Sequence, residues 1–189
     1  MTRPPQARDK VLAAARRIVE NRGAGHLTFD ELANESGVTR GGITYHFPTK
    51  EALLKALIEA DIADWERTSG TLEPHCPCAR TAEVMGQIRC NLASQDDGHK
   101  RFVSGLMSAA MVDPTLLDPI REYQRRKFAA WDWTESDQMR YVLLLAAEGL
   151  FWQEFFDLNP LPPDMRQRIA ATIERLAEQP DPGLWSPPT

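Results

Sequence analysis

The sequence predicts an all-α protein, and three observations support this fold class. Apolar residues recur at spacings of three and four along most of the chain, which is the period of an amphipathic helix. Glycine and proline stand mostly at the ends and junctions of these periodic segments. With 189 residues and 42% hydrophobic content, the chain can bury the core of one large domain or two small ones.

The charge is divided unevenly along the chain. The net charge is −5 at pH 7, yet residues 1 to 56 carry nine Lys and Arg against six Asp and Glu, so the acidic excess lies in the remainder. In physiological salt a charge acts over roughly 8 to 10 Å. An acidic body therefore does not prevent a basic N-terminal part from binding a polyanion.

Residues 6 to 22 form the first predicted helix, which Gly23 and Gly25 end. Thr28 and Glu31 have the spacing of a capping box, so the second helix should begin at Phe29. A glycine turn at Gly37 should follow this helix.

The third predicted helix runs from Arg40 to Phe47. Thr39 can cap its start, and Pro48 disfavours helical geometry at the residue before it. Thr49 can cap the helix that comes next, which places Lys50 in the first turn of that helix.

Gly41 and Gly42 make the third helix intrinsically weak, at about 1 kcal/mol each relative to alanine. Glycine permits close approach of another backbone, and a phosphodiester is a natural candidate. Around the glycines the helix offers Arg40, Thr44, Tyr45 and His46, while Val38, Ile43 and Phe47 can pack inward. We interpret this pattern as a helix-turn-helix whose second helix enters the DNA major groove.

Two basic residues outside this helix are candidate phosphate contacts. Lys50 is interpreted as a phosphate clamp, because an anion there would meet both the lysine and the free N–H groups of a helix start. Arg8 is either a further phosphate contact or a solvated surface charge.

Residues 8 to 57 resemble the DNA-binding domain of the tetracycline-repressor (TetR) family of bacterial regulators. The matching residues are Thr28, Gly37, Val38, Tyr45, His46, Phe47, Lys50, Glu51 and Leu53. The resemblance implies that Arg40 and Thr44 face base edges and that Thr28, Tyr45, His46 and Lys50 lie near phosphates. The predicted DNA-binding residues are Thr28, Thr39, Arg40, Gly41, Gly42, Thr44, Tyr45, His46 and Lys50.

The rest of the chain is predicted to be a second helical domain. We expect residues 1–48 to form the DNA-binding domain and residues 49–189 a ligand-binding and dimerisation domain, with a connector helix over 49–68. Further helices are expected at 81–94, 100–112, 115–131, 135–158 and 163–178.

The loop from Ser69 to Arg80 holds a small group of thiols and an imidazole. His75, Cys76 and Cys78, with Cys90 beyond, are weak candidates for a metal site or a thiol sensor. The spacing lacks the two-residue gap and second ligand pair of a zinc site, so a loop with inert thiols is the alternative. Three cysteines also argue against a disulfide framework.

Residues 135 to 158 are apolar around nearly the whole helix, so both sides should be buried. The resemblance implies a homodimer formed by the last two long helices. The predicted interface residues are Phe151, Phe155, Ile169, Ile173 and Leu176. The inward side is either plain core or an adaptable pocket. The candidate ligand-binding residues are Met85, Met107, Met111, Phe128, Trp131, Glu148, Trp152 and Phe156.

The sequence-based expectation is a homodimeric repressor that binds double-stranded DNA at a palindromic operator. A small molecule, apolar or aromatic, would release it. The alternatives are an activator or a thiol- or metal-responsive regulator with the same DNA-binding domain. No catalytic constellation or cofactor motif is found. The N-terminus lacks a signal-peptide core and no run could span a bilayer, which predicts a cytoplasmic protein.

Overall fold

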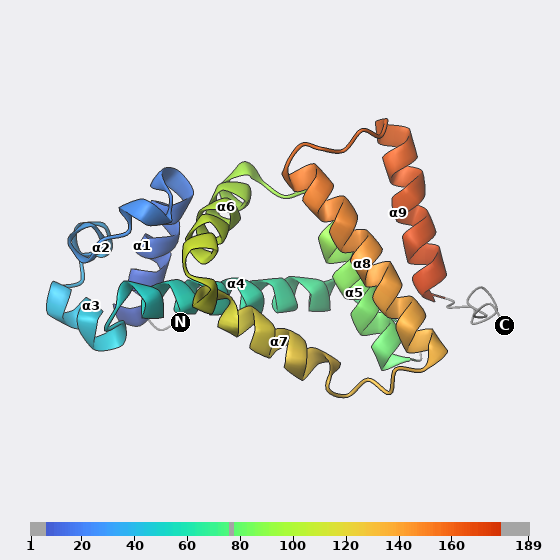
Figure 1. Ribbon diagram of the computed structural model, residues 1–189, viewed down its shortest axis with the longest axis horizontal. Helices are drawn as coiled ribbons and strands as arrows, with labels where there is room; N and C mark the ends of the chain where they lie inside the picture. Colours follow the sequence, from blue (N-terminus) through green and yellow to red (C-terminus); the bar gives the residue numbers. More distant parts are fainter. Residues whose placement is uncertain (1–6, 76–77, 179–189) are drawn as a thin grey trace. The chain divides into compact units, whose positions relative to one another are not determined.

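The computed structural model describes residues 7–75 and 78–178 (Figure 1). Over these residues the chain is helical without strands, which confirms the predicted fold class. None of these helices combines the length and apolar character needed to cross a bilayer. The elements are α1 (Ala7–Arg22), η1 (Ala24–His26), α2 (Phe29–Ser36), α3 (Arg40–His46), α4 (Lys50–Thr71), α5 (Ala79–Leu92), α6 (Asp97–Val112), η2 (Pro114–Leu117), α7 (Asp118–Phe128), α8 (Glu135–Phe155) and α9 (Pro163–Glu178).

The predicted start signals of the N-terminal helices are formed. The hydroxyl of Thr28 accepts a hydrogen bond from the Glu31 N–H at 3.2 Å, and Thr39 does the same for Gly42 at 3.2 Å. Gly37 ends α2 in the left-handed region with φ 68°, where glycine carries no Cβ penalty. One detail differs from the prediction, since the Glu31 carboxylate pairs with Arg22 and not with the Thr28 backbone.

The described residues pack as two compact units. The first contains residues 7–62 and 95–127, and its core joins α1, α2, α3 and the start of α4 to α6 and Leu116. Helix α6 comes close to α1 at Gly105, where an added Cβ would lie 2.8 Å from Val19 Cγ1. Because α6 packs along α1, this unit does not coincide with the predicted domain of residues 1–48.

The second unit contains residues 63–75, 78–94 and 128–178. Its helices α5, α8 and α9 lie side by side and share one apolar core (Figure 1). Ion pairs cross between them, such as Arg89 to Glu174 at 3.1 Å and Arg80 to Asp137 at 2.9 Å. Burial opposes ionisation of Asp137, but the contacts with Arg80 and the charge of Arg140 hold the pKa of its carboxyl below the usual value.

Several boundaries of the C-terminal helices differ from those predicted. The connector helix α4 continues to Thr71, and α5 starts at Ala79. The segment predicted as one helix over 115–131 divides into η2 and α7, because Asp113 accepts a hydrogen bond from the Thr115 N–H and caps the 3-10 turn. Helix α8 ends at Phe155, and Asp157 has φ 54°.

Candidate functional site

The outer face of α3 is polar and exposed over an apolar base. Ile43 and Phe47 are buried in the core of the first unit, whereas Arg40 and Thr44 are exposed and Tyr45 keeps 81% of its surface exposed. An aromatic ring left so open is available for contact with another molecule. The sequence therefore predicted the positions of these five side chains correctly, whereas His46 is half-buried.

Arg40 and Thr44 have partners in the free protein. The Arg40 guanidinium forms an ion pair with Asp30 of α2, and both side chains are largely exposed. The Thr44 hydroxyl donates to the backbone carbonyls of Arg40 and Gly41, each at 3.1 Å. The hydroxyl oxygen still has acceptor capacity, since the donated proton uses none of its lone pairs.

The two glycines of α3 have different surroundings. An added Cβ at Gly41 would meet nothing within 4 Å, so this side of the helix is open to an approaching backbone. At Gly42 the Cβ would lie 3.0 Å from Val38 Cγ1 and 3.3 Å from the Thr39 hydroxyl. Gly42 is therefore explained by packing at the helix start, and the close-approach argument applies to Gly41.

The remaining candidate phosphate contacts lie around the same helix. Thr28, Thr39 and Lys50 are exposed, and the ring of His46 packs edge-on to Tyr45 with 5.1 Å between centroids. The Lys50 ammonium donates to the Gly25 carbonyl at 3.4 Å. The Arg8 guanidinium lies 5.4 Å from the centre of the Phe47 ring, a cation–π position at the edge of the α3 base.

A capped short helix, a left-handed glycine turn and a second helix with a polar outer face define a helix-turn-helix protein. Residues 11–57 match the family model for bacterial regulatory proteins of the tetR family. Residues 84–178 match the model described as the tetracyclin repressor-like C-terminal domain. The two matches cover most of the chain, and the protein belongs to the tetR family.

Individual relatives are more distant. The chain is 29% identical over 105 residues to the nucleoid occlusion factor SlmA of Aliivibrio fischeri, which covers 54% of each protein. It is 27% identical over 100 residues to the HTH-type transcriptional regulator EthR of Mycobacterium tuberculosis, covering 53% of this chain and 46% of EthR. The chain thus spans about half the length of the curated relatives it matches.

The fold is also found in solved structures. The multidrug binding protein EbrR, crystallised with ethidium, superposes with a TM-score of 0.62 at 21% identity. The match covers 89% of this chain and 98% of EbrR. At this level of sequence identity, the similarity shows a shared fold alone.

The predicted ligand-binding residues are not all directed inward. Met107 and Met111 belong to the first unit and are 39% and 84% exposed, and in the second unit Trp152 and Phe156 are 37% and 51% exposed. The expectation of an inward stripe is wrong for these four residues. Met85 and Trp131 are buried, while Phe128 and Glu148 are half-buried in the second unit.

Aromatic rings of the second unit gather in two clusters. Phe128 and Trp131 pack with Trp133 and Tyr141, with centroid separations between 5.0 and 6.0 Å. The Arg80 guanidinium lies 5.6 Å from the centre of the Trp131 ring. The second cluster consists of Phe151, Trp152, Phe155 and Phe156. Sequence reasoning missed Trp133 and Tyr141, although Tyr141 stands seven residues before the candidate Glu148 on the same helix.

Two of the five predicted dimer residues are buried within the subunit. Phe155 and Ile173 are buried, and Phe151, Ile169 and Leu176 are half-buried. The exposed apolar residues of α8 and its C-cap form a separate row: Val142, Leu145, Gly149, Trp152 and Phe156. Their spacing alternates between three and four residues, so this row could have been found from the sequence.

Two buried side-chain atoms have no hydrogen-bond partner among the described residues, Gln87 Oε1 and Arg140 Nε. Gln87 of α5 is 3% exposed, and its amide nitrogen donates to Glu83 at 3.2 Å. Its Oε1 has no hydrogen-bond partner among the described residues. A buried polar atom without a partner costs about 1 to 3 kcal/mol, which marks Gln87 as a candidate ligand contact that the sequence analysis missed.

The structure describes some of the thiol and metal candidates, namely His75, Cys78 and Cys90. Cys76 lies outside the described residues, and those residues contain no group of three or more side chains suited to hold a metal. Cys78 is exposed, and a hydrogen bond with Thr81 lowers the pKa of its thiol. Cys90 is buried, and burial raises the pKa of its thiol. Cys90 is therefore poorly suited to thiolate chemistry.

Proposed function

We propose that the protein is a homodimeric transcriptional repressor that binds a palindromic DNA operator and leaves it when a small molecule binds the second unit. The observation that supports DNA binding best is the exposed polar face of α3 over its buried base. A regulator of this kind acts in the cytoplasm, without a cofactor and without catalysis.

In this proposal α3 enters the major groove. Arg40 and Thr44 meet base edges, while Thr28, Thr39, Tyr45, His46 and Lys50 surround the phosphates. Arg40 must first leave Asp30, and separating so exposed an ion pair costs about 0 to 1 kcal/mol. A bidentate contact with guanine returns about 1 to 3 kcal/mol, so the exchange favours the DNA complex.

Fluorescence anisotropy with the DNA upstream of the protein's own gene, and with a scrambled duplex, tests this assignment. Arg40→Ala should weaken specific binding by about 1 to 3 kcal/mol and change scrambled binding little. Lys50→Ala and Tyr45→Ala should weaken both. Arg125→Ala is the control, since Arg125 is exposed on α7 outside the proposed interface. Equal losses on both duplexes for Arg40→Ala would contradict its base-reading role.

We further propose that the exposed row on α8, rather than the five residues predicted from the sequence, forms the centre of the dimer interface. Alternating spacings of three and four keep one seam facing a partner helix. Gly149 in the middle of the row allows close approach. Two copies related by a two-fold axis can present two α3 helices about 34 to 36 Å apart, one turn of DNA, to the halves of a palindrome.

The effector is proposed to bind beside α5 in the second unit. The unpaired Oε1 of Gln87 supplies an acceptor, so the effector should carry an N–H or O–H donor. Val84 and Cys90 lie three residues before and after Gln87 on α5 and are also buried, which favours an otherwise apolar molecule. Induction then requires only that the effector bind the DNA-incompetent state more tightly than the competent one.

A further inference from the structure

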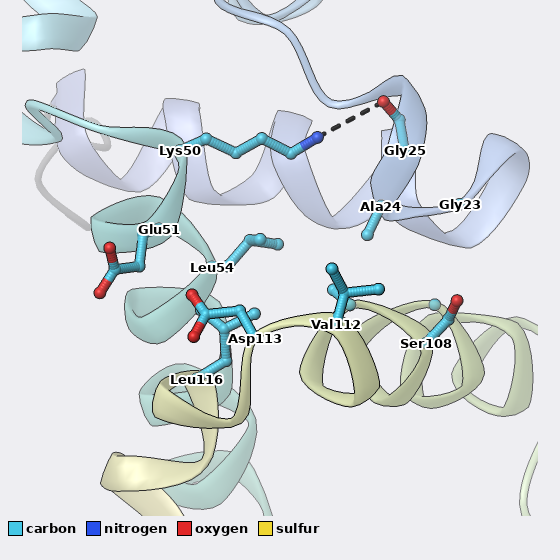
Figure 2. Close-up of a pocket in the computed structure, with 12 residues that line it drawn as sticks. Gly23, Ala24, Gly25, Lys50, Glu51, Leu54, Ser108, Val112, Asp113 and Leu116 are labelled. Atoms are coloured by element: carbon cyan, nitrogen blue, oxygen red, sulfur yellow. Dashed lines mark hydrogen bonds between the residues drawn. The ribbon is translucent and has the colours of Figure 1, made fainter.

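The first unit contains a cleft of about 510 Å³ that the proposed function does not use (Figure 2). Three segments far apart in the sequence form it: the turn at Gly23 to Gly25, the first turn of α4, and the last turns of α6 with Leu116 of η2. Its volume lies in the range of small-molecule sites, roughly 300 to 1,000 Å³. All of its lining residues belong to the first unit, beside the helix-turn-helix.

The walls of this cleft are largely apolar. Part of the wall consists of core residues whose side chains are buried: Ala24, Leu54 and Leu116. Val112, at the end of α6, is 88% exposed. Gly25 leaves its side of the cleft open, because an added Cβ would meet nothing within 4 Å. An apolar tail lying here would cover Val112, and the gain is about 25 cal/mol per Å² of apolar surface removed from water.

Three charged side chains border the cleft, and two of them already have partners. Glu51 is paired with Lys55 at 3.1 Å. Asp113 accepts hydrogen bonds from the backbone N–H and the hydroxyl of Thr115, at 3.1 and 2.7 Å. The carboxylates at the rim are therefore engaged in holding the local structure.

Lys50 is the exception. Figure 2 shows its side chain extended along the upper edge of the cleft toward the Gly25 carbonyl. That carbonyl is a neutral acceptor at 3.4 Å, and no described carboxylate lies within 4.0 Å of the ammonium. Glu51 and Asp113 keep their negative charges, but the Lys50 ammonium has no carboxylate partner among the described residues, so an anionic head group placed beside it can form an ion pair with it.

We propose that this cleft binds a small amphiphile with a carboxylate head on Lys50 and a short apolar tail against Leu54 and Val112. Binding would reduce DNA affinity, because the head group and a DNA phosphate would compete for the same ammonium. This second consequence rests on the proposed role of Lys50 in DNA binding, whereas occupancy of the cleft does not.

Three probes of equal tail length test occupancy: octanoate, octylamine and octan-1-ol, each titrated into ¹⁵N-labelled protein. The expected result is saturable binding of octanoate with shifts of the Gly25, Lys50 and Val112 amides, and at least tenfold weaker binding of the amine and the alcohol. Shifts confined to the second unit would overturn the proposal, as would octylamine binding as well as octanoate.

Variants test the two halves of the ligand separately. Lys50→Met should weaken octanoate at least tenfold, and Val112→Asp, at an exposed position, should do the same by repulsion. Gly25→Leu should exclude all three probes by filling the cleft. Lys10→Met, an exposed lysine on α1, is the charge-matched control and should bind octanoate as the native protein does. Unchanged octanoate affinity in both Lys50→Met and Val112→Asp would refute the site.

The DNA arm is measured separately by anisotropy. Saturating octanoate should weaken operator binding roughly tenfold in the native protein, the equivalent of one charged contact, and should have no effect in Lys50→Met. If octanoate occupies the cleft and operator affinity is unchanged, competition with phosphate is wrong. If the protein binds no DNA at all, the proposed function fails while the titration still decides whether the cleft binds a carboxylate.

Discussion

Leu145 lies next to Gly149 in the exposed row of α8, and replacing it with aspartate tests whether that row is a dimer interface. The side chain is 47% exposed in the single chain. Its loss should therefore leave the fold of the subunit intact, in contrast to a change at Ile173, which is buried within the subunit at 6% exposure.

The expected magnitude follows from this exposure. Complete burial of a leucine side chain stabilises by about 1.5 to 3 kcal/mol, and about half of that burial is already present in the subunit. Covering the other half yields about 0.7 to 1.5 kcal/mol, and two-fold symmetry doubles it to about 1.5 to 3 kcal/mol. Each 1.4 kcal/mol is tenfold in affinity, so the dissociation constant should rise about 10- to 100-fold. Desolvation of the two new carboxylates adds to this loss.

Sedimentation velocity over a micromolar concentration series measures the effect, with circular dichroism to confirm that the variant is folded. The matched control is Met111→Asp, since Met111 is 84% exposed on α6 and lies outside the row. The control should sediment as the native protein does. A folded Leu145→Asp variant that dimerises as strongly as the native protein would refute the assignment of the row.

Three further predictions concern single positions. Gly41→Ala should stabilise the fold by up to about 1 kcal/mol, because alanine favours the helix and its Cβ meets open space, and it should weaken DNA binding. Gly42→Ala should stabilise the fold less, because its Cβ would lie 3.0 Å from Val38 Cγ1. Thermal melts compare the stability of the two variants. The pKa of Asp137 is lowered on folding, so its stabilising contribution is present above about pH 3.9 and is lost as the pH falls through the lower folded pKa. Asp137→Asn should remove this pH dependence and lower the free energy of unfolding by about 3 kcal/mol, which denaturant titrations across that pH range measure. Gln87→Leu should leave the melting temperature unchanged or raise it, because a buried unpaired acceptor is removed. The same variant should respond more weakly to the effector in a reporter assay. A large drop in melting temperature would show that Gln87 serves packing alone.

Local chemistry explains why the helix-turn-helix could be predicted so fully. The caps at Thr28 and Thr39, the left-handed turn at Gly37 and the inward position of Ile43 depend on neighbours within a few residues. Such contacts leave a direct pattern in the sequence. The two glycines of α3 looked equivalent in that pattern, and only the position of Val38 beside Gly42 separated their roles.

The sequence by itself determined the fold class, the approximate positions of most helices and the polar face of α3, because periodicity and capping act over one or two turns. Tertiary structure decided which apolar residues are inside: it buried Phe155 and Ile173 within the subunit, and it left Leu145 outside. It also brought Gly25, Lys50 and Val112 around one cleft. A helix that is apolar all round carries no signal of which side meets its own chain, since that depends on packing between segments distant in sequence.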